Sequence, residues 1–389
     1  MIKRGIENRL LKLANSFKAV AVMGPRQSGK TTLVKSLFPE KDYVSLENPD
    51  IRTYALEDPR GFINDFKNGA IFDEVQRTPD LFSYLQEVID NSNDKGQFIL
   101  TGSNNLLLNQ NISQTLAGRV GYINLLPFTN SEIEAQNENK SDLDLLFNGF
   151  YPPVFDQNLD PTEWFPSYIQ TYIERDVRQI KNVTDLILFE RFLRIAAGRT
   201  AQELNMTSIS NDCGVDVKTV QAWISVLETS YIIFLLKPHH KNYNKTIVKR
   251  PKLFFYDTGI VCSLLGITEV DQLNYHPLKG SIFETMVVSE QVKSQSFDSK
   301  SGNLFYWRDK TGHEIDLIIE KAGSIYPMEI KSAKTINTRF FKNLTYYQNL
   351  SGVKQSALLY SGDEEQNRSN GIKVVNWRKL KSEQFPDKG

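Results

Sequence analysis

Residues 24–31 contain the pattern Gly-x-x-x-x-Gly-Lys-Thr, in which each fixed residue type has a separate role in binding phosphate. Gly24 and Gly29 allow a tight turn whose backbone N–H groups can approach phosphate oxygens. Lys30 supplies a positive charge for the β and γ phosphates, and the Thr31 hydroxyl can ligate Mg²⁺. The residues predicted to bind the nucleotide are Gly24, Pro25, Arg26, Gln27, Ser28, Gly29, Lys30, Thr31 and Thr32.

The segments on either side of this loop have the composition that a nucleotide site requires. Residues 19–23 are apolar throughout, which predicts a buried strand, and residues 32–38 predict a helix. A strand, a glycine loop and a helix in that order direct the positive end of the helix dipole toward an anion. A chance glycine turn would not be expected in this setting.

An acidic pair, Asp73 and Glu74, follows a second short apolar segment at residues 70–72. In a nucleotide hydrolase Asp73 would hold Mg²⁺ through water, and Glu74 would polarise the attacking water. Two acids at a strand end are also common where a chain simply turns into solvent. The phosphate loop at Lys30 favours the catalytic interpretation.

Two further segments contribute polar groups to the predicted site. The apolar strand at residues 97–101 ends next to Ser103, so Thr101 or Ser103 could contact the water or the γ-phosphate, unless the segment is a simple turn. Arg119 lies in an apolar stretch and could stabilise the γ-phosphate of a neighbouring subunit, or form a surface ion pair. The predicted catalytic residues are Lys30, Glu74, Ser103 and Arg119.

Composition is that of a globular protein, and the length of the chain suggests two or three domains. The chain has 389 residues, 40% hydrophobic and 24% charged, with a formal net charge of +0. A neutral balance does not exclude nucleic acid, because a local basic patch can bind phosphates. Cys213 and Cys262 have no metal-ligand spacing. With no signal peptide or long apolar run, a cytoplasmic protein without a membrane segment is expected.

The middle of the chain begins at a predicted turn over residues 149–153. Residues 164–180 have the apolar spacing of a helix, in which Arg175 or Arg178 could sense the nucleotide. Ion pairs along a solvated helix face would explain the same arginines.

Residues 207–228 predict two helices with a turn at Gly214, the second helix being capped by Asp216. Strands at 231–236 and 253–256 would then enclose residues 237–252, which contain no acid. This order is typical of a winged helix, whose basic hairpin can bind DNA phosphates. Winged helices also bind proteins, so that alternative stays open. The basic residues of the stretch are Lys237, Lys241, Lys245, Lys249, Arg250 and Lys252.

The last third of the chain contains a second set of charged residues. A helix carrying Glu284 precedes a predicted hairpin with Asp316 on its second strand, and a third strand carries Glu329 and Lys331. Residues two apart on a strand project from the same face, so Glu329 and Lys331 would meet Asp316. These groups would suit Mg²⁺ and an activated water attacking phosphate. The predicted metal ligands are Glu284, Asp316 and Glu329, with Lys331 beside them.

This second set resembles the PD-(D/E)xK nucleases, although Ile315 stands where the fullest pattern has proline. The resemblance implies that Asp316 and Glu329 bind the metal and that Lys331 positions water or transition-state charge. Glu284 matches the additional helical acid of many such enzymes. The same fold also serves as an inert DNA-binding or docking module, so cleavage is a separate question.

Residues 24–31, Asp73-Glu74, residues 101–103 and Gly118-Arg119 together resemble the AAA+ class of P-loop ATPases. More narrowly, the chain resembles a prokaryotic family in which this core is joined to a C-terminal domain of poorly defined function. The resemblance implies an α/β chain in three parts. These are an AAA+ core with a parallel sheet (1–150), a helical lid with a winged helix (151–275) and a restriction-endonuclease-like α/β domain (276–389).

The expected function is Mg²⁺-dependent ATP hydrolysis by a homo-oligomer, with a hexamer as one option, acting on DNA. DNA would contact residues 237–252 and the C-terminal domain, and branched or recombining DNA would suit a ring-forming motor. The alternative is an ATP-dependent signalling switch that binds a protein partner. Its nuclease-like domain would then be catalytically silent.

Overall fold

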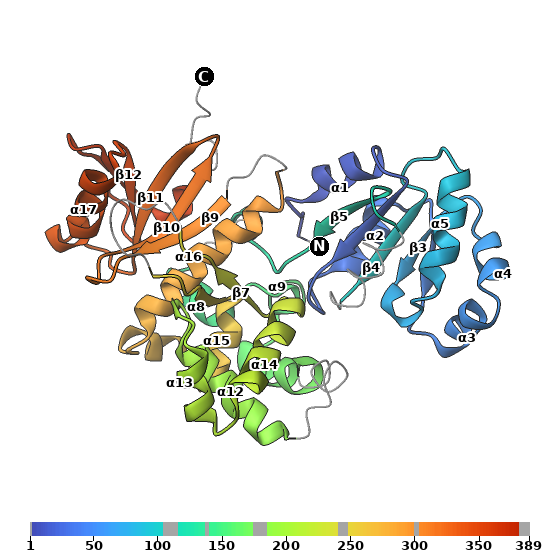
Figure 1. Cartoon of the computed structure of the whole chain (residues 1–389), viewed down its shortest axis with the longest axis horizontal. Coiled ribbons are helices and arrows are strands. Elements are labelled where there is room, and N and C mark those ends of the chain that lie inside the picture. The colour runs from blue at the N-terminus through green and yellow to red at the C-terminus, as the bar shows by residue number, and fades with distance from the viewer. Residues whose placement is uncertain are drawn as a thin grey trace.

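The computed structural model describes residues 2–103, 116–136, 140–173, 185–239, 248–298 and 303–380. Three sheets follow one another along the chain: five parallel strands, then three antiparallel strands among helices, then six mixed strands (Figure 1). Arg175, Arg178 and residues 240–247 of the basic stretch lie outside the described residues.

The first sheet has the strand order β2-β3-β4-β1-β5 and is parallel throughout. The strands predicted at 19–23, 70–72 and 97–101 are confirmed. The sheet's strands are β1 (Ala19–Met23), β2 (Asp42–Ser45), β3 (Ala70–Asp73), β4 (Phe98–Gly102) and β5 (Val120–Asn124). Its helices, with one 3₁₀ turn, are α1 (Glu7–Ala14), α2 (Lys30–Leu37), α3 (Pro49–Glu57), α4 (Pro59–Asn64), η1 (Val75–Arg77) and α5 (Leu81–Asn91).

Helices cover both faces of this sheet, which is why β1 is apolar at every position. Ala19, Ala21 and Met23 face a cluster that includes residues of α3, α4 and α5. Val20 and Val22 face the opposite cluster, formed with α1 and α2. Successive residues of β1 thus point into two apolar layers on opposite faces of the sheet, and the strand fixes the start of the phosphate loop between them.

The middle region is mostly helical, with a small sheet of order β6-β8-β7. The two helices predicted over 207–228 are confirmed, and the Asp216 carboxylate caps the second by accepting from Thr219 N. The region comprises α7 (Asn130–Glu134), α8 (Asp142–Asn148), α9 (Pro152–Asp156), α10 (Pro161–Tyr168), a π-helix (Ile169–Ile173), α12 (Leu186–Gly198), β6 (Gln202–Glu203), α13 (Met206–Cys213), α14 (Val217–Thr229), β7 (Ile233–Leu236), β8 (Lys252–Phe255) and α15 (Thr258–Leu264).

Two predicted boundaries in this region differ from the structure. The turn expected over 149–153 ends early, because Pro152 begins α9 at the first helical position, where its missing N–H costs nothing. The helix expected from residue 164 begins at Pro161 and passes into the π-helix after Tyr168. The residues beyond 173 in that prediction lie outside the described chain.

The C-terminal sheet has the order β13-β14-β12-β11-β10-β9. The predicted helix, hairpin and third strand are confirmed: β9, β10 and β11 are antiparallel, and β12 and β14 then continue in parallel with β11. The elements are η3 (Val270–Asn274), α16 (Lys279–Gln295), β9 (Asn303–Arg308), β10 (Glu314–Lys321), β11 (Ser324–Lys331), η4 (Thr338–Phe341), α17 (Lys342–Ser351), β12 (Ser356–Tyr360), β13 (Gln366–Asn367), β14 (Ile372–Asn376) and η5 (Trp377–Lys379).

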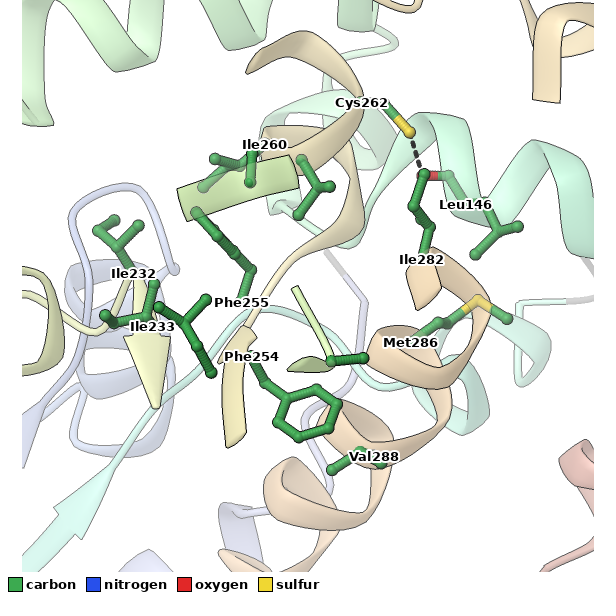
Figure 2. Packing of buried hydrophobic residues seen from close by; sticks show 14 of the residues in the cluster. Leu146, Ile232, Ile233, Phe254, Phe255, Ile260, Cys262, Ile282, Met286 and Val288 are labelled. Atoms are coloured by element: carbon green, nitrogen blue, oxygen red, sulfur yellow. Dashed lines mark hydrogen bonds between the residues drawn. The ribbon is translucent and has the colours of Figure 1, made fainter. Parts of the chain in front are cut away.

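One apolar core joins the middle region to the C-terminal sheet. Figure 2 shows Phe254 and Phe255 of β8 in the same cluster as Ile282 and Met286 of α16. The cluster also includes buried residues of β10, β11 and β12. Apolar packing therefore continues across the boundary expected near residue 275.

Within the described ranges, no helix is both long enough and apolar enough to span a membrane.

Asp257 is a buried carboxylate that connects two segments of the middle region. Its oxygens accept from the backbone N–H groups of Gly259 and Ile260 at the start of α15 and from Phe150 N, 2.7 Å away. We expect Asp257→Ala to lower the free energy of unfolding by about 3 kcal/mol, because three buried donors lose their acceptor. Asp216→Ala removes an exposed cap and should cost only about 1 kcal/mol. Denaturant titrations of both variants test this, and equal losses would contradict it.

Candidate functional site

The phosphate loop connects β1 to α2, as its sequence predicts. A Cβ atom at Gly24 would lie 2.0 Å from the carbonyl oxygen of Leu125, so only glycine fits there. Gly29, with φ of 88°, is the N-cap of α2. The Lys30 ammonium donates to the carbonyl oxygens of Gly24 and Pro25 at 3.0 and 2.8 Å. The Lys30 ammonium is therefore held against the loop that would bind the phosphates.

Asp73 is the meeting point of three hydroxyl groups. Thr31 Oγ1 donates to Asp73 Oδ2 at 3.1 Å, and the Tyr43 hydroxyl donates to the same oxygen at 2.6 Å. Thr101 Oγ1 donates to the other oxygen, so Thr101 contacts Asp73. Burial, and then the neighbouring Asp73 carboxylate, raise the pKa of Tyr43, which keeps the phenol a neutral donor. The predicted pair Thr31–Asp73 comes together, and Tyr43 is an unpredicted partner.

Glu74 is positioned by Ser103, which directly follows the neighbouring strand β4. Ser103 Oγ donates to Glu74 Oε2 at 3.2 Å, and the Gln76 amide also donates to that oxygen. Glu74 has a φ of 56°, in the left-handed region that few non-glycine residues occupy. Two predicted catalytic residues, Glu74 and Ser103, are therefore in contact, and Gln76 adds a third group.

The residues at the phosphate loop fit a magnesium ion. A threonine hydroxyl and a carboxylate 3.1 Å apart are hard oxygen donors of the kind that Mg²⁺ prefers. When bound with nucleotide, the ion would neutralise charge on the β and γ phosphates. Thr31 and Asp73 would hold it, while Glu74 and Ser103 lie close enough to orient a water.

A pocket of about 100 Å³ adjoins the loop at Gln27 and Gly29. Its apolar lining would suit a flat nucleotide base, and its polar groups could accept or donate hydrogen bonds to the base edge. No local pattern reveals this pocket, because it is assembled from distant segments of the chain. Its other lining residues are Ile2, Arg4, Thr32, Leu33, Phe128, Pro152, Pro153, Asp156 and Gln157.

Arg119 lies away from the phosphate loop of its own chain. It immediately precedes β5, whose first residue pairs with Ala19 at the amino end of β1. The phosphate loop follows the carboxyl end of β1. Arg119 and the loop therefore lie at opposite ends of the strands. Arg119 forms an exposed ion pair with Asp90, its Nη2 lying 3.0 Å from Asp90 Oδ2. The ion pair that the sequence left as an alternative is present.

In the C-terminal sheet, Asp316, Glu329 and Lys331 come together as predicted. The Lys331 ammonium lies 2.8 Å from Glu329 Oε1 and 3.5 Å from Asp316 Oδ2, which also accepts from Ile330 N. Burial, and then repulsion from Asp316, raise the pKa of Glu329 to about 8. Burial opposes the charge on Lys331, but Asp316 and Glu329 outweigh it and raise its pKa.

Glu284 is part of a neighbouring group that includes two unpredicted residues, Glu314 and Lys252. Carboxylate oxygens of Glu284, Glu314 and Asp316 lie within 4.8 Å of one another, and the Lys252 ammonium donates to Glu284 Oε1 at 2.8 Å. Burial works against the charge on Lys252, yet the surrounding carboxylates raise its pKa. Burial also raises the pKa of Glu284, to about 8, with Lys252 opposing.

These residues do not fit the magnesium ion that the sequence predicts. The oxygen donors have the right chemistry, but a lysine ammonium already lies among them. Glu329 turns toward Lys331, so the three predicted ligands do not form one group. Glu314 could have been found from its position two residues before Asp316 on the strand. Lys252 could not, because it comes from β8 in the middle region.

Residues 16–134 match the AAA domain family. This match supports an AAA-type ATPase in the first part of the chain. Residues 140–271 and 279–380 match two families described only as domains of unknown function, DUF8612 and DUF4143. Uncharacterized proteins of Mycobacterium bovis and Mycobacterium tuberculosis are each 29% identical over 338 residues, covering 86% of this chain and 74% of theirs.

Among solved structures, a Walker-type ATPase of Pyrococcus abyssi is 14% identical and has a TM-score of 0.46. The similarity covers 68% of this chain and 96% of that one. The Aeropyrum pernix Orc1 protein, solved in complex with DNA, is 14% identical with a TM-score of 0.28, covering 69% and 93%.

The hydrogen bond from Tyr43 to Asp73 should affect the affinity of the ATP site for Mg²⁺. In Tyr43→Phe the Asp73 carboxylate loses one of the donors that orient it. We therefore expect half-maximal ATP turnover to require about tenfold more Mg²⁺. Tyr54→Phe is the matched control. The Tyr54 hydroxyl on α3 is exposed and donates to Asp65, which follows α4. Turnover measured against Mg²⁺ concentration at saturating ATP tests this, and identical curves for both variants would contradict it.

Proposed function

We propose that this protein is an oligomeric AAA-type ATPase that hydrolyses ATP with Mg²⁺ and acts on DNA. The arrangement of Thr31, Asp73 and Glu74 beside the phosphate loop is the observation that carries the proposal. Lys30 and the loop N–H groups would bind the β and γ phosphates. Glu74, oriented by Ser103, would activate the water.

Arg119 supports an oligomer if it has a catalytic role. It lies at the opposite end of the strands from its own phosphate loop, so it would act on the nucleotide of a neighbouring subunit. Its partner Asp90 is exposed, and an exposed ion pair is weak enough to exchange for a phosphate. A homo-oligomer, with a hexamer as one option, would supply that neighbour.

The order of elements in the middle region supports a winged helix, with α14 as its recognition helix. The order of one helix, a short strand, two helices and two further strands, with the sheet order β6-β8-β7, is the order that a winged helix would be expected to have. Lys218 and Gln221 on α14 are exposed, as are Lys249 and Arg250 before β8. These side chains would contact DNA phosphates.

The C-terminal region supports a nuclease-like domain that binds DNA. Its helix α16, the antiparallel β9-β10-β11 and the parallel strand β12 after α17 have the order expected of the restriction-endonuclease-like fold. Branched or recombining DNA would suit the combination with a ring-forming ATPase.

A second candidate function is an ATP-dependent switch that binds a protein partner. It is favoured by the ends of the basic stretch, which pair with β9 instead of extending freely. His239 N donates to Tyr306 O at 2.7 Å, Tyr306 N donates to Lys237 O at 3.1 Å, and Val248 N donates to Arg308 O at 3.0 Å. Lys252 and His239 are themselves buried, so these two predicted members of the DNA-contacting surface are unavailable to phosphates.

Substitutions at the phosphate loop test the ATPase itself. We expect Lys30→Ala to abolish nucleotide binding, because the charge at the phosphates is lost. Glu74→Gln should bind ATP while turnover falls by about 10²-fold or more, since the water is no longer activated. Lys12→Ala, an exposed lysine on α1, is the control. Fluorescent-nucleotide binding and phosphate release measure both steps, and hydrolysis retained in Lys30→Ala and Glu74→Gln would refute the assignment.

Turnover with linear and branched DNA distinguishes a DNA motor from a protein-binding switch. A motor should be stimulated by DNA, and its DNA affinity should fall with salt by about 0.9 log units per log unit for each phosphate contact. The double variant Lys249→Ala, Arg250→Ala should therefore reduce the steepness of this salt dependence by the amount that about two phosphate contacts contribute. Lys354→Ala, which removes another exposed lysine, should leave it unchanged. Turnover indifferent to DNA, without DNA retention, would favour the switch.

A further inference from the structure

Lys252 is a buried cation that links two parts of the chain. It is the first residue of β8 in the middle region, and it is 2% exposed. Its ammonium donates to Glu284 Oε1 of α16 at 2.8 Å and forms an ion pair with Glu314 of β10. One lysine of the small sheet thus contacts two carboxyl groups from different elements of the C-terminal region.

Each carboxylate that a metal would need already has a protein donor. The second oxygen of Glu314 lies 3.2 Å from Arg308 Nη1. Asp316 Oδ2 accepts from Ile330 N at 2.8 Å and lies 3.5 Å from the Lys331 ammonium. Glu284, Glu314 and Asp316 therefore each have at least one donor from within the chain.

We infer that the ammonium of Lys252 takes the place of the divalent metal in the nuclease-like site, so that this site is held closed by an internal ion pair. The inference relies on the proposed nuclease likeness only for the expectation of a metal. It does not depend on ATP hydrolysis.

The position of Lys252 in the sheet explains why a metal would not displace it easily. Its backbone pairs with Leu236 of β7 on one side and with Glu203 of β6 on the other. Moving the ammonium out of the cluster would therefore disturb the central strand of that sheet. A divalent ion entering with the ammonium still present would face a buried positive charge within the same small group.

The ion pair also explains how the small sheet and the C-terminal sheet are held together. Glu203 of β6, opposite Lys252 in the strand register, lies 3.1 Å from Arg308 Nη1 of β9. Charges thus alternate across the junction from Glu203 to Arg308, Glu314, Lys252 and Glu284. The carboxylates typical of a metal-dependent nuclease serve here as a junction between two parts of the protein.

Binding of Mn²⁺ alone to the full chain tests the inference. All proteins carry Asp73→Asn, so that the ATP site contributes no metal. With Lys252 intact we expect no bound Mn²⁺ by electron paramagnetic resonance at millimolar metal. Lys252→Gln should gain one Mn²⁺ site with affinity increased by about 10²-fold, because a unit charge beside the ion is removed. Adding Asp316→Asn to Lys252→Gln should abolish the new site.

The control is Lys249→Gln, an exposed lysine of the same stretch, which should bind no Mn²⁺. Saturable Mn²⁺ binding by the protein with Lys252 intact, lost on Asp316→Asn, would overturn the inference. So would a folded Lys252→Gln variant that binds none. If Lys252→Gln unfolds, the intact protein still gives the deciding measurement. Refolding of that variant by Mn²⁺, followed by circular dichroism, would support the inference.

Discussion

The buried guanidinium of Arg4 is the contact on which the arrangement of the phosphate loop depends. It donates to the carbonyl oxygen of Ser28 in the loop at 2.9 Å and to that of Leu126 after β5 at 2.7 Å. Its Nε donates to Glu132 of α7 at 3.0 Å, and both partners of this ion pair are buried. Removing one partner of such a pair typically costs about 3–5 kcal/mol, because the other charge is left buried. The loop is thereby tied to the start of the middle region.

Helix α16 continues this connection toward the other charged cluster. Near its end Lys293 donates to Phe128 O at 3.1 Å, and Glu290 accepts from Asn130 N at 2.8 Å, both beside α7. Near its start the same helix presents Glu284 to Lys252. Burial lowers the pKa of Lys293 to about 8 and raises that of Glu290 to about 7. A single helix therefore contacts the segment at the start of α7 near one end and the Lys252 cluster near the other.

Local patterns predicted the elements well and the contacts between distant elements poorly. The phosphate loop, Asp73 and Glu74 were found because a strand, a glycine turn and a helix lie within one short stretch of sequence. The strands bearing Asp316 and Glu329 were predicted as apolar segments separated by turns. Tyr43 was missed because β2 meets β3 only through the sheet order, which no local pattern encodes. The same limit applies to the pocket beside the phosphate loop, whose walls come from four separated segments.

Lys252 shows how composition can mislead when burial is unknown. In the sequence it is one of several basic residues in an acid-free stretch, and this composition favours contact with phosphate. In the fold its backbone is the start of a central strand, which turns the side chain inward to carboxylates that follow it by 32 residues and more. A lysine on a surface hairpin and a lysine inside a sheet have the same charge but opposite partners. The acids that contact an inward-facing lysine are then less available to a metal. The position of Lys252 therefore changes the interpretation of both the basic stretch and the carboxylate cluster.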